Sequence, residues 1–239
     1  MSHPCKIRVA IVDYGLGNLF SVKHACEYVG MQATITSSKE WILSSDAVIL
    51  PGVGAFGDAM KSLRQLDLIG PLKEVVGLQK PLIGICLGMQ LLMTESYEFG
   101  RHSGLGIIDG PVVRFDDSVN SPTRLKVPQI GWNRILRRRH RQVEGESDGP
   151  NPDSWSGSPL EGLPDETFMF FVHSFYAMPV DSNLVLAVSE YGNIEFCSSI
   201  RYGNTFSFQF HPERSGSEGL RIYRNLASLI QKQMRRSEG

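Results

Sequence analysis

A cysteine lies between two glycines in the run Gly84-Ile85-Cys86-Leu87-Gly88, where an apolar stretch gives way to helical spacing. This is the cysteine form of the G-x-S-x-G turn, which holds a nucleophile at a sharp strand-to-helix junction. Small neighbours are needed there, because the backbone is strained and other segments approach closely. A helix start also favours thiolate. The spacing therefore predicts a reactive thiol at the carboxyl end of a strand, where open α/β sheets bind ligands.

A cysteine nucleophile needs a base, and His211 is the best placed of the six histidines. It ends an apolar strand-like run, Pro212 stops that run, and Glu213 follows at once. A carboxylate in this position can orient the imidazole and support its charged form. The pattern predicts a Cys86–His211–Glu213 triad, with His173 as the competing base. The alternative for either histidine is a satisfied polar group in the core.

Two glycines follow a strand-like run in the segment Pro51-Gly52-Val53-Gly54. Such glycines can be simple turn residues. They can also form a loop whose peptide N–H, near Val53, stabilises a tetrahedral oxyanion, with the N–H of Leu87 as a second donor. The run DYGLGN has G-x-G without a third glycine, so a dinucleotide-binding fingerprint is poorly supported.

The other cysteines, Cys5, Cys26 and Cys197, are scattered, with no C-x-x-C pair and no histidine cluster beside them. Their spacing fits neither a zinc site nor a disulfide framework. We expect buried, inert thiols at these positions. We also expect no metal ion and no cofactor.

Composition argues against several classes of protein. The 239 residues are 41% hydrophobic and 21% charged, enough for one domain with a substantial core. The formal net charge is -1, so no overall field points to nucleic acid or to a membrane surface. No apolar run approaches the roughly 18 residues of a membrane span, and the run near the N-terminus is too short for a signal peptide. We expect a cytoplasmic protein.

Apolar strand-like runs alternate with helical spacing in the first half of the chain. Near-continuous apolar strands of this kind indicate a parallel sheet covered by helices on both faces. Strand-like runs joined by turn residues follow in the second half and indicate hairpins. We expect one α/β domain over residues 1–239, with a parallel first half and a mixed or antiparallel second half. The expected strands are 7–12, 33–36, 47–50, 81–85, 112–115, 168–176, 184–188, 195–200 and 205–210, and the expected helices are 19–29, 56–66, 87–95 and 219–234.

Residues 137–162 differ in composition from the rest of the chain. They are rich in arginine, glycine, serine, proline and aspartate and contain few residues to bury. This composition predicts a flexible surface insertion. The basic run RRRHR at its start can bind phosphate or a partner, although such runs are more often a solvated face.

Several motifs together resemble the class I glutamine amidotransferase family. GICLGMQ, PGVG and a distant HPE carry the wider resemblance. More narrowly, the chain resembles glutaminase subunits of imidazole glycerol phosphate synthases through DYGLGN, LPGVGAF, GICLGMQLL, GLGIIDG, VPQIGWN, FFVHSFY and FQFHPERS. These blocks run from about residue 8 to residue 231, so the resemblance covers nearly the whole chain apart from the insertion.

The resemblance implies a flavodoxin-like α/β fold, with a mostly parallel central sheet flanked by helices and a mixed or antiparallel C-terminal portion. It implies hydrolysis of L-glutamine to glutamate and ammonia. Cys86 would attack the carboxamide, His211 would carry a proton to the leaving ammonia, and Glu213 would orient His211. The N–H groups of Val53 and Leu87 would bind the oxyanion.

The resemblance also implies a partner and a mode of substrate binding. The ammonia would pass to a (β/α)8 cyclase subunit, docked over the mouth of the site as the other half of a heterodimer. Asn18 and Arg214 would lie at that interface. The residues that would hold the amino-acid end of glutamine are Gln90, His173, Ser174 and Phe175, with Gly52 close to it.

Departures from the family pattern leave the pathway open. Arg214 follows HPE where the family more often has lysine, Gln129 stands where histidine is expected, and the 137–162 insertion is unusual. We predict that the ammonia serves imidazole glycerol phosphate synthesis in histidine biosynthesis. The alternative is a paralogous branch that supplies ammonia for amino or amidino sugars of bacterial surface polysaccharides. The runs EFCSS and HPERS favour that branch. A stand-alone cysteine hydrolase and a regulatory module with a dead site are the remaining hypotheses.

Overall fold

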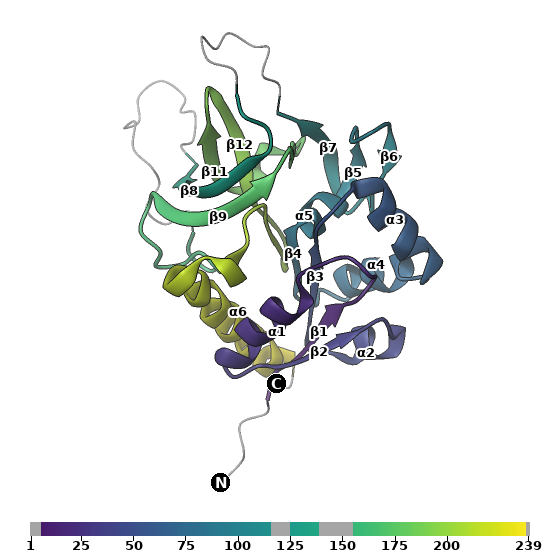
Figure 1. Ribbon diagram of the computed structural model, residues 1–239. Coiled ribbons are helices and arrows are strands. Elements are labelled where there is room, and N and C mark those ends of the chain that lie inside the picture. The colour runs from purple at the N-terminus through teal and green to yellow at the C-terminus, as the bar shows by residue number, and fades with distance from the viewer. Residues whose placement is uncertain (1–5, 116–124, 139–154, 238–239) are drawn as a thin grey trace.

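In the residues described by this computed structural model (6–115, 125–138 and 155–237), a nine-stranded mixed sheet forms the centre of the molecule (Figure 1). Its strand order is β2-β1-β3-β4-β13-β12-β11-β8-β9. The first five strands are parallel and follow the order of flavodoxin-like folds. They are β1 (Arg8–Val12), β2 (Gln32–Thr36), β3 (Ala47–Gly52), β4 (Leu82–Cys86) and β13 (Thr205–Phe208), and the antiparallel remainder is β12 (Ile194–Tyr202), β11 (Val185–Tyr191), β8 (Gln129–Arg137) and β9 (Thr167–His173).

Side chains of the parallel strands alternate between two cores, one on each face of the sheet. In β1, Val9 and Ile11 pack on one face and Ala10 and Val12 on the other, and all four are buried. The predicted α/β fold is confirmed, with helices on both faces of the parallel half of the sheet; the other half is antiparallel, so the sheet as a whole is mixed. The first face is covered by α1 (Leu19–Tyr28) and α6 (Gly216–Ser237), and the second by α2 (Lys39–Ser44), α3 (Phe56–Gln65) and α4 (Ile69–Gly77) (Figure 1).

The described residues also form a four-stranded sheet with the order β10-β7-β5-β6. A helix was expected through residue 95, but α5 (Leu87–Leu91) ends early and the chain enters β5 almost at once. That prediction is wrong, because β5 pairs with β7 and β6, and these long-range ladders outweigh the local helical spacing. The strands are β5 (Met93–Ser96), β6 (His102–Ser103), β7 (Ile108–Arg114) and β10 (Phe175–Ala177).

The single strand expected over 168–176 is divided at Ser174. β9 pairs with β8 in the larger sheet, whereas β10 pairs with β7 in the smaller one, so the chain changes sheets at this residue. The crossing brings residues 173–175 to the carboxyl ends of the parallel strands, where the candidate site lies. The sequence patterns did not predict α2, α4 or β8, or the short turns η1 (Ser182–Leu184) and η2 (Pro212–Arg214).

The segment predicted as a flexible insertion is ordered at both of its ends. Residue 137 belongs to β8, and Trp155 is fully buried, donating from Nε1 to the Leu186 carbonyl at 2.8 Å. Asn225 of α6 donates to the carbonyls of Pro159 and Glu161 at 2.9 and 2.8 Å. The prediction is therefore wrong for residues 155–162, because the large apolar side chains there join the core. Residues 139–154 of the proposed insertion lie outside the described residues.

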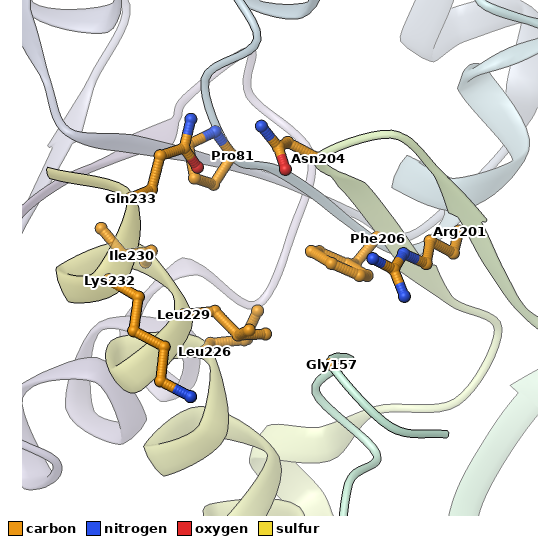
Figure 2. A pocket seen from close by; sticks show the side chains of 10 residues that line it. All are labelled: Pro81, Gly157, Arg201, Asn204, Phe206, Leu226, Leu229, Ile230, Lys232 and Gln233. Carbon is orange, nitrogen blue, oxygen red and sulfur yellow. The ribbon is translucent and has the colours of Figure 1, made fainter. Parts of the chain in front are cut away.

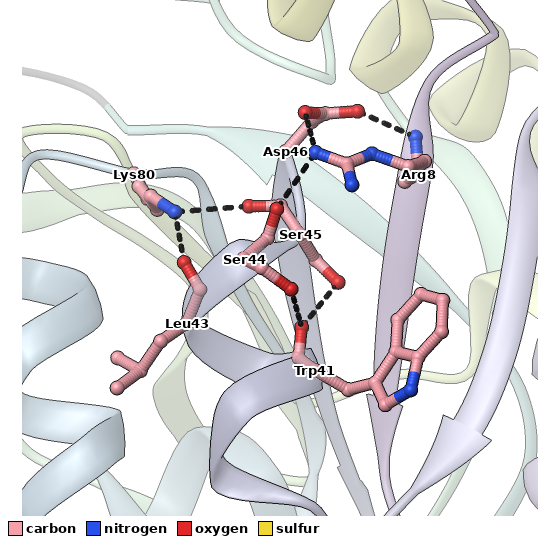
Figure 3. A network of polar contacts seen from close by, with 7 residues as sticks. All are labelled: Arg8, Trp41, Leu43, Ser44, Ser45, Asp46 and Lys80. Atoms are coloured by element: carbon pink, nitrogen blue, oxygen red, sulfur yellow. Dashed lines mark hydrogen bonds and ion pairs between the residues drawn. The ribbon is translucent and has the colours of Figure 1, made fainter.

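A polar network ties together the amino ends of the strands that lead to the site (Figure 3). Arg8, at the start of β1, donates to the Ser44 carbonyl at 2.8 Å and pairs with Asp46 at 3.2 Å. Lys80, just before β4, donates to the carbonyls of Leu43 and Ser45. The exposed Arg8–Asp46 pair contributes little free energy, and the contacts of Lys80 are partly buried. All of them lie where β1, β3 and β4 begin. Within the described ranges no helix is long and apolar enough to cross a membrane.

Candidate active site

Cys86 is the last residue of β4 and stands directly before α5, with φ 55° and ψ -111°. A left-handed backbone costs a non-glycine residue on the order of 1–3 kcal/mol, and it is kept where the surrounding structure enforces it. The neighbouring glycines explain how it is enforced. A Cβ on Gly88 would lie 1.7 Å from the Leu50 carbonyl oxygen, and one on Gly84 would lie 3.0 Å from the backbone of Met89. Their absence lets α5 pack directly on β3 and β4, so that the thiol stands at the carboxyl end of β4.

Gly88→Ala is expected to destabilise the protein by more than about 3 kcal/mol, since the added methyl group meets backbone that cannot move aside. Urea unfolding would measure the loss. Gly70→Ala is the matched control, because a Cβ there meets nothing within 4 Å and the residue lies in α4. It should leave stability unchanged or raise it by up to about 1 kcal/mol. Equal stability of the two variants would contradict the steric account of the turn.

His211 follows β13, the strand next to β4, and its side chain pairs with Glu213. Nδ1 of His211 lies 2.8 Å from Glu213 Oε1, and both side chains are almost completely buried. A carboxylate only accepts, so Nδ1 carries the proton. The His211 N–H donates to the Phe170 carbonyl at 2.9 Å, and the Ser215 hydroxyl donates to the His211 carbonyl at 2.7 Å while accepting from the Phe170 N–H at 3.0 Å. The imidazole is thus oriented from both its side chain and its backbone.

The charge state of His211 is set by competing effects. Burial disfavours the imidazolium and so lowers the pKa of His211. The negative charge of Cys86 and the interaction of its sulfur with the ring raise that pKa, and Glu213 raises it further. These effects outweigh burial and bring the pKa of His211 to about 10. Because Glu213 occupies Nδ1, Nε2 is the atom left for the thiol. Nε2 is buried and has no protein partner at hydrogen-bond distance in the part of the chain that the structure describes.

His173, the competing base, lies beside the nucleophile in a very different environment. Its ring is packed against Phe115, Phe171 and Phe196, with centroids 5.1 to 5.7 Å away. Nδ1 donates to the Phe175 carbonyl at 2.9 Å. Burial lowers the pKa of His173 to about 4, so the ring is neutral at physiological pH. A neutral ring without a carboxylate partner suits packing and substrate contact, and His211 is the better base.

A cavity of about 300 Å³ opens over the thiol at the carboxyl ends of β3 and β4. It brings together residues from five separate segments, including the sheet-changing segment 173–175. Predicted site residues line it directly, and Gly52, which pairs with Cys86 in the sheet, lies beside it. Four other predicted site residues are not in the lining: Asn18, His211, Glu213 and Arg214. The lining residues are Val53, Gly54, Cys86, Leu87, Gln90, Glu98, Pro128, Val172, His173, Ser174 and Phe175.

Gln90 is held from two directions at the cavity wall. Its Nε2 donates to the Phe175 carbonyl at 2.8 Å and to Gln209 Oε1 at 3.0 Å. Gln209, which sequence reasoning missed, is fully buried, and its own Nε2 lies 3.8 Å from Cys86 Sγ. It therefore connects the thiol to Gln90. The sequence feature that could have indicated it is an amide side chain between Phe208 and Phe210, since a buried polar side chain in an aromatic run needs a hydrogen-bond partner.

Glu98 is a second residue that sequence reasoning missed. It lines the cavity, and its carboxylate accepts from the Phe56 N–H at 2.5 Å, which fixes it at the start of α3. Glu98 is half-buried and is the one carboxylate among the described residues that line this cavity. The sequence did not point to Glu98, because a helix was expected over residues 87–95 and the turn that carries Glu98 was therefore not predicted.

The predicted oxyanion donors belong to two different segments of the cavity wall. Val53 follows β3 and is 41% exposed, and Gly54 after it has a φ of 101° that favours glycine. Leu87 is buried and is the first residue of α5. Both line the cavity. Their role as donors stays a prediction.

A second cavity, of about 320 Å³, lies at the other end of the same strands (Figure 2). It is lined by Pro81 before β4 and Asn204 before β13, and by Leu226 and Ile230 of α6. None of its lining residues is a cysteine, histidine or carboxylate, so it lacks the thiol, imidazole and carboxylate that are found at the first site. In the described ranges no three histidine, cysteine or carboxylate side chains are grouped to hold a metal ion.

The family model for glutamine amidotransferase class-I matches residues 10–228. An imidazole glycerol phosphate synthase subunit HisH from Aquifex aeolicus is 40% identical over 95% of this chain and 99% of its own. The protein of the same name from Sulfurimonas denitrificans is 44% identical over 91% and 96%.

Two solved structures share the fold. A putative GMP synthase protein from Thermoplasma acidophilum has a TM-score of 0.67 at 16% identity, covering 99% of this chain and 100% of its own. A glutamine amidotransferase structure has a TM-score of 0.65 at 20% identity, covering 93% and 98%. The matched family model and the similar sequences place this chain in the class I glutamine amidotransferase family, among the HisH subunits of imidazole glycerol phosphate synthase.

Proposed function

We propose that this protein is a glutaminase subunit that hydrolyses L-glutamine to glutamate and ammonia and supplies the ammonia to a synthase subunit that makes imidazole glycerol phosphate in histidine biosynthesis. One observation carries the chemistry. Cys86 stands in a strained turn beside the buried His211–Glu213 pair, in a cavity that also contains Gln90. A nucleophile, a base and a group that orients the base are the parts that acyl transfer from an amide requires.

In the first half of the reaction, the Cys86 thiolate attacks the carboxamide carbon of glutamine. The carbonyl oxygen becomes an oxyanion, for which the N–H groups of Val53 and Leu87 are the proposed donors. His211, protonated on Nε2, gives its proton to the departing nitrogen, so that ammonia leaves and a glutamyl thioester remains. Glu213 stabilises the imidazolium before this transfer.

In the second half, neutral His211 accepts a proton from a water molecule that attacks the thioester. The C–S bond breaks, glutamate leaves and the thiolate–imidazolium pair is restored. The negative charge of Cys86 and the buried carboxylate of Glu213 both favour the return of the proton to His211.

The amino-acid end of glutamine is proposed to bind on the side of the cavity away from His211. Glu98 is suited to the α-ammonium group, because it is a fixed carboxylate on the cavity wall. Gln90 and the segment of His173, Ser174 and Phe175 are the proposed contacts for the rest of that end. A volume of about 300 Å³ suits a small amino acid rather than a peptide.

An exposed apolar surface beside the cavity supports a partner subunit, proposed to be a (β/α)8 cyclase in a heterodimer. In the β8–β9 hairpin, Ile130 is paired with Val172 and Trp132 with Phe170, so their side chains share one face. Ile130 and Trp132 are 65% and 54% exposed, whereas Val172 reaches the cavity. Arg214 stacks over Phe170 at 4.4 Å and adds a cation to this surface. Asn18, which precedes α1 after β1, lies at the same carboxyl edge.

The similar proteins favour histidine biosynthesis over surface-sugar synthesis as the use of the ammonia, because proteins 39–44% identical to this chain bear the name of the imidazole glycerol phosphate synthase subunit. A stand-alone hydrolase is less suited to an exposed apolar surface at the mouth of the site.

Glutamate release should be measured with and without the partner synthase subunit. We expect the partner to raise turnover, and Trp132→Asp to weaken partner binding by about thirtyfold, the loss of about 2 kcal/mol typical of an interface anchor. Leu78→Ser is the control, because Leu78 is 55% exposed at the end of α4, just before the amino end of β4, whereas the cavity lies at the carboxyl end of that strand. Efficient cleavage of peptides without a partner would contradict the proposal, and so would a Trp132→Asp variant that binds the partner normally.

A further inference from the structure

Tyr14, in the DYGLGN run, is a buried tyrosine to which neither the resemblance nor the proposed chemistry gives a role. It follows β1, is 2% exposed, and donates its hydroxyl proton to the Pro51 carbonyl at 2.8 Å. Pro51 and Gly52 are the final residues of β3 and pair with Ile85 and Cys86 of β4. The hydroxyl therefore holds the strand end from which the Val53 loop departs.

Tyr14 and Gly52 fit each other closely. A Cβ on Gly52 would lie 2.3 Å from the Tyr14 hydroxyl oxygen and 2.9 Å from Leu87 Cβ. Any side chain at residue 52 would displace the hydroxyl from this place. The glycine at position 52 thus serves contact with Tyr14 as well as backbone freedom.

The hydroxyl remains a donor in the working enzyme. Burial raises the pKa of Tyr14 far above its ordinary value, and the negative charge of nearby Cys86 raises it further. It keeps its proton when the thiol is ionised, so the bond to the Pro51 carbonyl survives in the reactive state. The same electrostatic coupling means that Tyr14 lies near the nucleophile.

We propose that Tyr14 is a positioning residue for the oxyanion loop, anchoring the Pro51 carbonyl so that the Val53 N–H keeps its distance from the carbon that Cys86 attacks. This inference rests on the proposed function. Beyond the anchor, Val53 is exposed and Gly54 has a positive φ that favours glycine. The bond from Tyr14 confines movement to the peptides after Pro51. Displacing an N–H donor such as that of Val53 by about 1 Å can lower the rate by as much as a hundredfold.

Two reactions of Cys86 distinguish a role of Tyr14 in positioning the oxyanion loop from a general effect of Tyr14 on the reactivity of the thiol. Glutamine hydrolysis passes through an oxyanion, whereas alkylation by iodoacetamide is a displacement at a methylene carbon, in which the C–I bond breaks, the C–S bond forms and iodide leaves. In Tyr14→Phe we expect kcat for glutamine to fall by about tenfold or more, with KM nearly unchanged, since an oxyanion donor is worth about 100- to 1,000-fold. The alkylation rate of Cys86 should match that of the unaltered protein. It also reports whether the variant keeps a native site.

Tyr202→Phe is the matched control, because Tyr202 lies at the far end of β12 and is 43% exposed. It should change neither reaction. An unchanged kcat in Tyr14→Phe would overturn the anchor, and so would parallel losses in hydrolysis and alkylation, which would assign Tyr14 to the thiol. If the unaltered protein releases no glutamate even with its partner, the proposed function fails and the anchor with it.

Discussion

Replacing Cys86 by alanine is expected to reduce glutamate release from glutamine by at least about 10,000-fold, with or without the partner subunit. The thiol is the atom that forms the covalent intermediate, and no other thiol lines the cavity in the described part of the chain. His211 and Glu213 cannot substitute, because in the proposed reaction they transfer and stabilise a proton and do not attack the carboxamide carbon. Steady-state glutamate production would measure the loss, and the thermal unfolding midpoint would show that the variant is folded.

Cys197→Ala is the control for removing a cysteine. Cys197 is buried in the opposite core cluster, and burial raises its pKa to about 12, so it is inert as a nucleophile. The variant should keep its glutaminase activity. A diazo-ketone analogue of glutamine should label Cys86 and spare Cys197 and Cys26, whose pKa burial also raises strongly. Even labelling of these thiols under native conditions, or turnover by Cys86→Ala, would refute the assignment.

His211→Asn should lower kcat by about 1,000- to 10,000-fold, because the leaving nitrogen then departs without a proton. The unaltered protein should have an unusual pH profile. Since the pKa of His211 is raised to about 10, the proton donor persists through pH 9, and activity should decline as pH rises through about 10. The stability of the folded protein should also decline as pH rises through this range. The stabilisation from charged His211 is complete below its ordinary pKa of 6.5 and is lost as pH rises through about 10.

Glu213→Gln tests the origin of this shift. The hydrogen bond and the charge of Glu213 both help to raise the pKa of His211, so the alkaline limb should move to lower pH in this variant. Glu161→Gln is the control, because that exposed carboxylate accepts from the Gly157 N–H and does not line the cavity. An alkaline limb that Glu213→Gln leaves in place would contradict the role given to this carboxylate.

The sequence alone predicts those features of the site that depend on residues close together in the chain. The glycines around Cys86 predict a sharp turn, because only small residues permit close backbone approach, and the turn has the positive φ of such a site. The position of His211 at the end of an apolar run, with Glu213 two residues later, predicts a pair that the structure holds at 2.8 Å. Apolar runs alternating with helical spacing were likewise enough to predict the parallel sheet, because burial on both faces requires such runs.

Contacts between distant segments were decided by the tertiary structure alone. β5 replaces the end of an expected helix because its partners, β6 and β7, satisfy its backbone. Trp155 joins the core because Leu186, on another strand, accepts its N–H. Gln209 reaches Cys86, and Glu98 reaches the cavity, only once the sheets are assembled. The contact between Tyr14 and Pro51 has the same origin, since the two residues are separated by 37 positions in the chain and are joined by the pairing of β1 with β3.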